Sequence, residues 1–128
     1  LGILDEHQGR RKGEGVSYNR RWTSSQDSLI AVLPIGYADG YHRRLSNKGL
    51  MLVQDRVVPV VGTVCMDYTL VDVSALRENN QDLYGMSVIV IGQDQTQSVK
   101  AEDLAELVGT NAYEILTSVS RRVPRVYR

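Results

Sequence analysis

The sequence predicts a mainly β domain, a small β-barrel-like arrangement of short strands followed by one or two short C-terminal helices. Up to Gly92, short apolar or β-branched runs alternate with turn residues, a pattern typical of an all-β barrel or sandwich. After Gly92, apolar residues recur at helical spacing. The 128 residues, 42% hydrophobic and 23% charged, are ordinary for a single soluble domain with one core.

The N-terminal part is predicted to hold a tail and two strands. We expect residues 1–12 to be a polar tail or linker with at most one short strand, and the domain to cover residues 13–128. Residues 16–23 are rich in β-prone side chains and predict one strand. Residues 28–35 predict a second strand, which can pair with the first in antiparallel fashion.

The second strand runs into a Gly/Asp-rich turn that is the first candidate for a functional site. Pro34 cannot donate a ladder hydrogen bond and therefore suits a strand end. Gly36 and Gly40 bracket Tyr37 and permit backbone conformations that other residues avoid. Turns of this kind hold binding groups on a rigid scaffold. The alternative is a plain surface turn whose tyrosines only pack.

The remaining elements follow from the same alternation of patterns. We expect a helical turn or irregular loop at 42–49, strands at 50–53, 56–61, 68–73, 86–91 and 123–127, a loop at 74–81, and helices at 101–108 and after Asn111. Glu102 and Asp103 suit the first turn of a helix and Gly109 its end. Asn111 stands three residues before Glu114, a helix-capping spacing.

Charge and cysteine content exclude several classes of function. Lys plus Arg equals Asp plus Glu at 15 each, so no overall field favours a nucleic acid or an anionic membrane. Cys65 is the sole cysteine, which excludes an internal disulfide and favours a reducing compartment. No apolar run approaches the roughly 20 residues that span a bilayer. The chain starts at Leu1 without a signal-peptide pattern, and we expect a fragment of a longer protein.

The tyrosines are the candidate chemical groups. The chain has 7 Tyr, 1 Trp and no Phe, and a buried tyrosine hydroxyl usually has a hydrogen-bond partner. Tyr18, Tyr37, Tyr68 and Tyr113 are the candidates, the last at a helix start where free N–H groups attract phosphate. With a reference pKa of about 10, a tyrosine acts as a base near neutral pH only where positive charge or hydrogen bonds favour the phenolate.

Other titratable residues give weaker signals. Cys65 is interpreted as a packing residue rather than a nucleophile, because His7 and His42 are the only histidines and neither stands in a pairing motif. Asp39 and His42 match neither a metal cage nor a catalytic triad, so no metal site is predicted. Taken alone, these features indicate a small β-rich domain with tyrosine-bearing turns.

Five short segments carry a more specific signal. They are Val16-Ser17-Tyr18, Leu33-Pro34-Ile35-Gly36-Tyr37-Ala38-Asp39-Gly40, Pro59-Val60-Val61-Gly62 with Val64-Cys65-Met66-Asp67, Asn111-Ala112-Tyr113-Glu114, and Arg122-Val123-Pro124-Arg125-Val126-Tyr127. In order and spacing, from about Gly13 to Arg128, they closely resemble the C-terminal domain of bacterial alanine racemases.

The resemblance implies a two-domain enzyme that works as a head-to-tail dimer. In this family an N-terminal (β/α)8 barrel holds pyridoxal phosphate on a lysine, and none of Lys12, Lys48 or Lys100 matches that lysine. Tyr18 matches the tyrosine that serves as acid/base on the L-alanine face, opposite the lysine that serves the D face. The C-terminal domain reaches into the barrel of the partner subunit.

Further residues match positions around the family's substrate and cofactor. They are Met66, whose backbone contacts the substrate, Tyr37, which lines the narrow entrance, Arg43 of the entry corridor, and Tyr113, which hydrogen-bonds the cofactor phosphate. Two positions depart from the pattern: Asn19 stands where glycine is common, and Thr63 where an arginine is often found. The exact amino-acid specificity therefore stays open.

The resemblance leads to one hypothesis and two alternatives. We expect the C-terminal domain of a cytoplasmic bacterial alanine racemase that interconverts L- and D-alanine for peptidoglycan, inactive until joined to its pyridoxal phosphate barrel and dimerised. One alternative is a non-catalytic β-barrel module whose tyrosines mediate protein association. The other is a related decarboxylase on the same two-domain plan, against which the turn at residues 36–40 argues.

Overall fold

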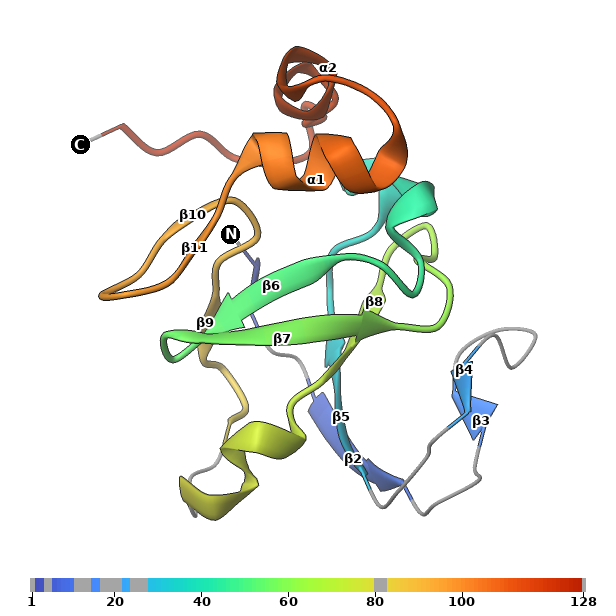
Figure 1. Ribbon diagram of the computed structural model, residues 1–128, viewed down its shortest axis with the longest axis vertical. Coiled ribbons are helices and arrows are strands. Elements are labelled where there is room, and N and C mark those ends of the chain that lie inside the picture. The colour runs from blue at the N-terminus through green and yellow to red at the C-terminus, as the bar shows by residue number, and fades with distance from the viewer. Residues whose placement is uncertain are drawn as a thin grey trace.

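A five-stranded antiparallel sheet organises the chain (Figure 1). The computed structural model describes residues 2–3, 6–10, 15–16, 22–23, 28–79 and 83–127. In spatial order the sheet contains β2 (Glu6–Arg10), β5 (Ser28–Leu33), β8 (Thr69–Asp72), β7 (Arg56–Val61) and β6 (Leu50–Val53). The predicted mainly β class with two short C-terminal helices is confirmed.

The strand pairing continues beyond this sheet and gives the fold its barrel-like character. Leu52 of β6 bridges to Ile89, directly after β9 (Ser87–Val88), and β9 pairs with β1 (Gly2–Ile3). Because β1 and β2 are consecutive in the chain, the ladder of pairs begins and ends at neighbouring strands. Residues 1–12, expected to be a tail, thus contribute two strands to the pairing.

The predicted single strand over residues 16–23 is wrong. The structure has two short strands there, β3 (Gly15–Val16) and β4 (Trp22–Thr23), which pair with each other. The expected partner strand, β5, pairs instead with β2 and β8. The β-branched and aromatic residues at both ends of the segment have the same propensity in one strand as in two halves of a hairpin, so composition does not distinguish them.

Three further expectations are corrected. The loop expected at 74–81 contains a 3-10 helix, η4 (Ser74–Asn79). The strand expected at 86–91 is reduced to β9 and the bridge at Ile89, because the chain bends at Val90 and Ile91 before the next strand begins at Gly92. The segment 123–127 forms no strand among the described residues. Its Arg125 instead donates hydrogen bonds to nearby carbonyl groups and folds the chain back on itself.

The helices match their predicted bounds because their signals are local. The first, α1 (Ala101–Val108), begins where the Asp103 carboxylate accepts from the Lys100 amide at 3.0 Å and ends at Gly109, where φ is 83°. The second, α2 (Ala112–Thr117), begins where the Asn111 side chain accepts from the Glu114 amide at 3.0 Å. Among the described residues, no helix combines the length and apolar character needed to cross a membrane.

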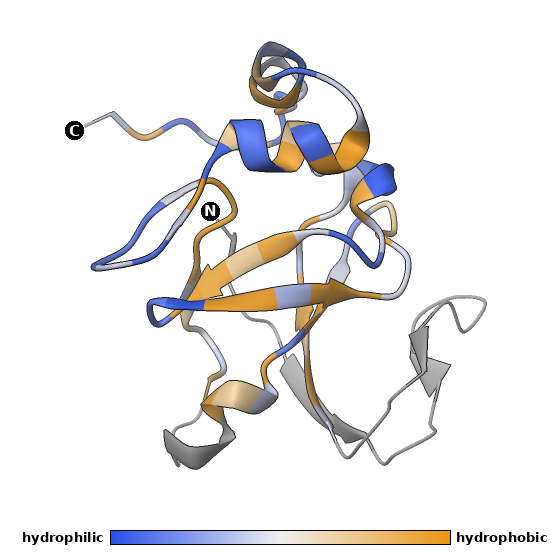
Figure 2. Cartoon of the chain, in the orientation of Figure 1, coloured by the Kyte–Doolittle hydropathy of each residue, from blue (hydrophilic) through white to orange (hydrophobic). Residues whose placement is uncertain are grey.

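The hydrophobic core lies between the strands and α1 (Figure 2). The turn after β5 adds two 3-10 helices, η2 (Tyr37–Asp39) and η3 (Arg43–Leu45), and between them Tyr41 is buried at 4% exposed. The Tyr41 hydroxyl has no hydrogen-bond partner among the described residues, contrary to the expectation for a buried tyrosine, and burial raises its pKa. The hydroxyl occupies the space in which Gly49 lacks a side chain.

Asp55 joins two hairpins that are distant in sequence. Gln54 and Asp55 form the β6–β7 turn with φ of 51° and 59°, and the Asp55 carboxylate accepts from the Thr96 amide at 2.9 Å and the Gln97 amide at 2.8 Å. These residues belong to the turn between β10 (Gly92–Gln93) and β11 (Ser98–Val99). The hydrogen bonds, led by the one from the Thr96 side chain, lower the pKa of Asp55.

Gly49→Ala is expected to destabilise the fold through Tyr41. A Cβ at position 49 would lie 2.2 Å from the Tyr41 hydroxyl, and overpacking of this kind costs about 1–3 kcal/mol. Tyr41→Phe alone should leave the free energy of unfolding unchanged or higher, because it removes an unpartnered hydroxyl. The double variant should recover part of the loss in urea denaturation. A large loss for Tyr41→Phe alone would contradict this account.

Asp55→Asn is expected to lower the melting temperature by an amount that depends on pH. The carboxylate has a lowered pKa in the folded chain, so its contribution is complete above the unfolded-state pKa of about 3.9 and is lost as the pH falls through the folded-state value. The difference in melting temperature between the parent and Asp55→Asn should therefore be constant near neutral pH and shrink under acid. Asp94→Asn is the variant to compare with Asp55→Asn. The Asp94 carboxylate accepts from the Asp55 amide at 2.9 Å and so belongs to the same contact between the two hairpins.

Candidate functional site

The turn after β5 lies directly on the loop before β8. The Tyr37 amide donates to the Cys65 carbonyl and the Ala38 amide to the Met66 carbonyl, both at 3.0 Å. Gly36 makes this approach possible, because a Cβ there would lie 2.2 Å from the Cys65 oxygen and 2.4 Å from the Met66 oxygen. Two residues assigned to the substrate from the sequence, Tyr37 and Met66, are thereby brought side by side.

Both of these side chains face outward from the domain. Tyr37 is 47% exposed and Met66 53% exposed. Their turn is fixed from within, since the Asp39 carboxylate accepts from the Gly36 amide at 2.9 Å. Gly40, with φ of 110°, packs so closely on the end of α2 that a Cβ would lie 2.4 Å from the Ser118 carbonyl oxygen. The exposed pair is thus held by a rigid backbone.

Arg43 shares a surface hollow with Tyr37. The hollow has a volume of about 290 Å³ and is lined by Tyr37, Gly40, His42, Arg43 and Ser118. The imidazole of His42 accepts from the Arg44 amide through Nδ1 at 3.1 Å and so caps the start of η3, the helix that carries Arg43. The Ser118 hydroxyl donates to the Gly40 carbonyl at 3.1 Å and closes one wall.

Tyr113 lies on α2, next to the Asn111 cap, and is 81% exposed. It does not line the hollow that contains Tyr37 and Arg43. Tyr18 and Asn19, the proposed acid/base and its neighbour, lie outside the described residues. Thr63, at the position where the family pattern often has an arginine, is uncharged and buried at 4% exposed.

Cys65 is partly buried within the loop before β8. Its thiol donates to the Thr63 carbonyl at 3.5 Å. A hydrogen bond with Cys65 and the charge that the thiol can carry raise the pKa of Tyr68. The described residues contain no group of His, Cys, Asp and Glu side chains able to hold a metal ion. The packing interpretation of Cys65 stays a prediction.

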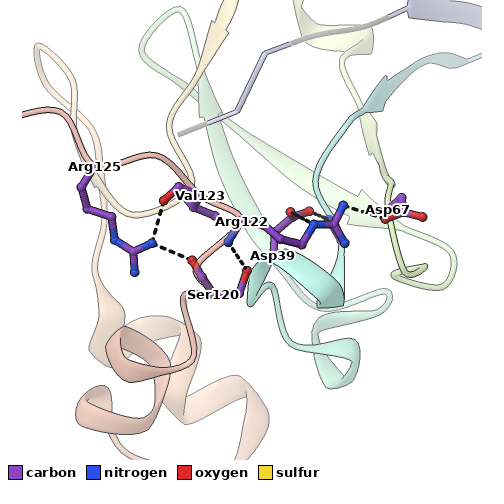
Figure 3. A network of polar contacts seen from close by, with 7 residues as sticks. Asp39, Asp67, Ser120, Arg122, Val123 and Arg125 are labelled. Carbon is purple, nitrogen blue, oxygen red and sulfur yellow. Dashed lines mark hydrogen bonds and ion pairs between the residues drawn. The ribbon is translucent and has the colours of Figure 1, made fainter.

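Arg122, for which the sequence predicts no role, connects the turn after β5 with the loop before β8. The Arg122 Nη2 donates to the Asp67 carboxylate at 2.9 Å, and its Nε lies 3.5 Å from Asp39 Oδ1 (Figure 3). The hydrogen bond to Asp67, followed by the charge of Asp39, raises the pKa of Arg122. The segment that contains Arg122 contributed to the resemblance, but nothing local in it indicates two carboxylate partners.

Comparisons with known proteins show which proteins this chain is similar to. The family model described as "Alanine racemase, C-terminal domain" matches residues 6–127. The alanine racemase of Geobacter sulfurreducens is 47% identical over 116 residues, which cover 90% of this chain and 30% of that protein. The alanine racemase of Clostridium novyi is 43% identical over 115 residues, with 90% and 29% covered. The chain thus spans about 30% of the length of these relatives.

Solved structures of alanine racemases share the fold. The enzyme from Bacillus anthracis with bound L-Ala-P superposes with a TM-score of 0.88 at 35% identity, covering 98% of this chain and 31% of that one. The enzyme from Bartonella henselae with covalently bound pyridoxal phosphate superposes with a TM-score of 0.87 at 32% identity, covering 98% and 33%. The likeness extends over nearly all of this chain.

Gly36→Ala is expected to separate the turn from the loop. The added Cβ would meet two backbone carbonyl groups, which cannot rotate away, so we expect a loss of at least about 3 kcal/mol in the free energy of unfolding. Gly109→Ala is the matched control: its φ is 83° and no atom lies within 4 Å of the added Cβ, so only backbone strain of about 1–2 kcal/mol is expected. Equal losses in the two variants would refute the steric argument.

Proposed function

Because the chain belongs to the alanine racemase C-terminal domain family, we propose that it supplies one side of the active site of a pyridoxal-phosphate-dependent alanine racemase. The observation that carries this proposal is the docked turn, which presents Tyr37 and Met66 on one exposed surface beside Arg43. The reaction interconverts L- and D-alanine, and its product serves peptidoglycan synthesis in the bacterial cytoplasm.

The rest of the site is assigned to a pyridoxal phosphate barrel in the partner subunit of a dimer. The described residues fit a supporting contact to the cofactor, because the exposed Tyr113 can reach a phosphate presented from outside the domain. They do not fit the covalent anchor: Lys48 and Lys100 are exposed side chains at positions that do not match the family's lysine. When bound, pyridoxal phosphate supplies the electron sink for a carbanion at the alanine Cα.

Tyr18 is the proposed acid/base on the L-alanine face. Inversion of a carbon centre requires that a proton leaves one face and returns to the other, so two groups on opposite sides are needed. The phenol of Tyr18 serves one side, and the barrel serves the other. Since the reference pKa of tyrosine is about 10, positive charge or hydrogen bonds from the barrel must favour the phenolate near neutral pH.

The docked turn and loop are proposed to bind and enclose alanine. The Met66 carbonyl already accepts from Ala38, while no described residue accepts from the Met66 amide. We assign that amide to the substrate carboxylate, as a charge-assisted hydrogen bond. Tyr37 narrows the entrance and limits access of water, and the Arg43 guanidinium attracts the carboxylate in the corridor that leads inward.

A chimeric enzyme tests the proposal. In the Geobacter sulfurreducens alanine racemase, this chain would replace the matching C-terminal domain, and racemisation would be measured with D- and L-alanine in the presence of pyridoxal phosphate. We expect activity in both directions. A chimera that folds, dimerises and binds pyridoxal phosphate but does not racemise alanine would favour the alternative, a module for protein association.

Tyr18→Phe in the same chimera tests the acid/base role. Loss of a general acid/base costs about 10²–10⁴-fold in rate, and we expect exchange of the Cα proton of L-alanine with solvent to fall by this amount while exchange from D-alanine falls far less. Tyr84→Phe is the matched control, since Tyr84 is 63% exposed on a different loop, and it should leave both rates unchanged. Equal loss from both enantiomers would exclude the role assigned to Tyr18.

A further inference from the structure

We propose that Arg122 is a positioning residue that holds the Tyr37 turn and the Met66 loop in register. This inference rests on the proposed function, because it assigns Arg122 to the substrate side of the site. Its guanidinium binds Asp67, the neighbour of Met66, and Asp39, the last residue of the helix that begins with Tyr37. One side chain therefore spans both segments.

The two oxygens of the Asp39 carboxylate contact different partners, the Gly36 amide and the Arg122 guanidinium. Oδ2 accepts from the Gly36 amide at 2.9 Å, and Oδ1 lies 3.5 Å from Arg122 Nε. Asp39 is also the more enclosed partner, with 13% of its side chain exposed against 61% for Asp67. A shift of Arg122 would thus act on the turn through Asp39 and on the loop through Asp67.

The C-terminal segment is built to keep Arg122 in place. The Ser120 amide donates to the Asp39 carbonyl at 3.0 Å, so the backbone just before Arg122 is attached to the same turn. Arg125 donates to the Ser120 and Val123 carbonyls at 2.6 Å each (Figure 3). It also donates to the Val119 carbonyl at 3.1 Å. These bonds close the chain into a tight turn on either side of Arg122.

The exposure of Arg122 indicates that it positions the turn and the loop without contributing much to the stability of the fold. About half of its side chain is exposed at 51%, and ion pairs at such exposure contribute little to global stability. The turn and the loop, by contrast, are linked by two backbone hydrogen bonds, from the Tyr37 amide to the Cys65 carbonyl and from the Ala38 amide to the Met66 carbonyl. Loss of Arg122 should therefore loosen this pair while leaving the fold intact.

Kinetics of the chimera described above test the inference, with Arg122→Gln as the main variant. We expect KM for alanine to rise about three- to tenfold, kcat to change less, and the absorbance of bound pyridoxal phosphate and the melting temperature to stay close to those of the parent chimera. Arg122→Lys should recover part of the loss, because one ammonium group can hold one carboxylate. Arg121→Gln, at the exposed neighbouring position, is the control and should leave KM unchanged.

A double-mutant cycle and hydrogen exchange give independent answers. Arg122 acts on the loop through its ion pair with Asp67, so the double variant Asp67→Asn, Arg122→Gln should raise KM no more than the larger of the two single effects. Additive effects on KM would overturn the inference. Deuterium uptake measured by mass spectrometry should increase in peptides that cover residues 36–41 and 63–68. Unchanged uptake there would also overturn it, and this readout does not require an active chimera, so failure of the proposed function is recognised separately.

Discussion

Much of the structure depends on the close contact between the turn after β5 and the loop before β8. β5 and β8 are antiparallel neighbours with Leu33 opposite Thr69, so the chain leaves one strand and enters the other at the same end of the sheet. The Thr69 hydroxyl donates to the Ile35 carbonyl at 2.6 Å and fixes the point of exit. The two amide donors that follow, of Tyr37 and Ala38, then reach the loop carbonyls only because position 36 has no side chain.

Because backbone groups make the contact between the turn and the loop, the side chains there remain available to bind other molecules. Tyr37 and Met66 make no contribution to the buried core and are about half exposed, whereas the apolar residues on either side of them close the interior. The C-terminal segment returns to this place and adds charged side chains where the backbone contact ends, through Arg122 and its two carboxylates. This surface thus combines a fixed backbone with side chains that remain exposed for binding, as a preorganised binding site requires.

The sequence predicts those features whose determinants are local. The β6–β7 hairpin and both α-helices have the expected bounds, because Gln54-Asp55, Gly109 and Asn111 act within a few residues of the elements that they delimit. The β3–β4 hairpin and the irregular end at 123–127 depend on pairing partners and on carbonyl groups that composition does not specify. The contact of Arg122 with Asp39 and Asp67 joins three distant segments, so only a fold or a family pattern can indicate it.

The exposure of the site residues explains why one domain would carry only part of a catalytic site. Water competes for every polar group at an open surface, and an electrostatic contact to a carboxylate is weak there compared with one in an enclosed site. Tyr37, Met66 and Tyr113 are exposed by 47%, 53% and 81%, so within this chain none of them is shielded from solvent. Under the proposed function, the barrel of a partner subunit supplies that shielding, and dimerisation becomes a condition for catalysis and not only for stability.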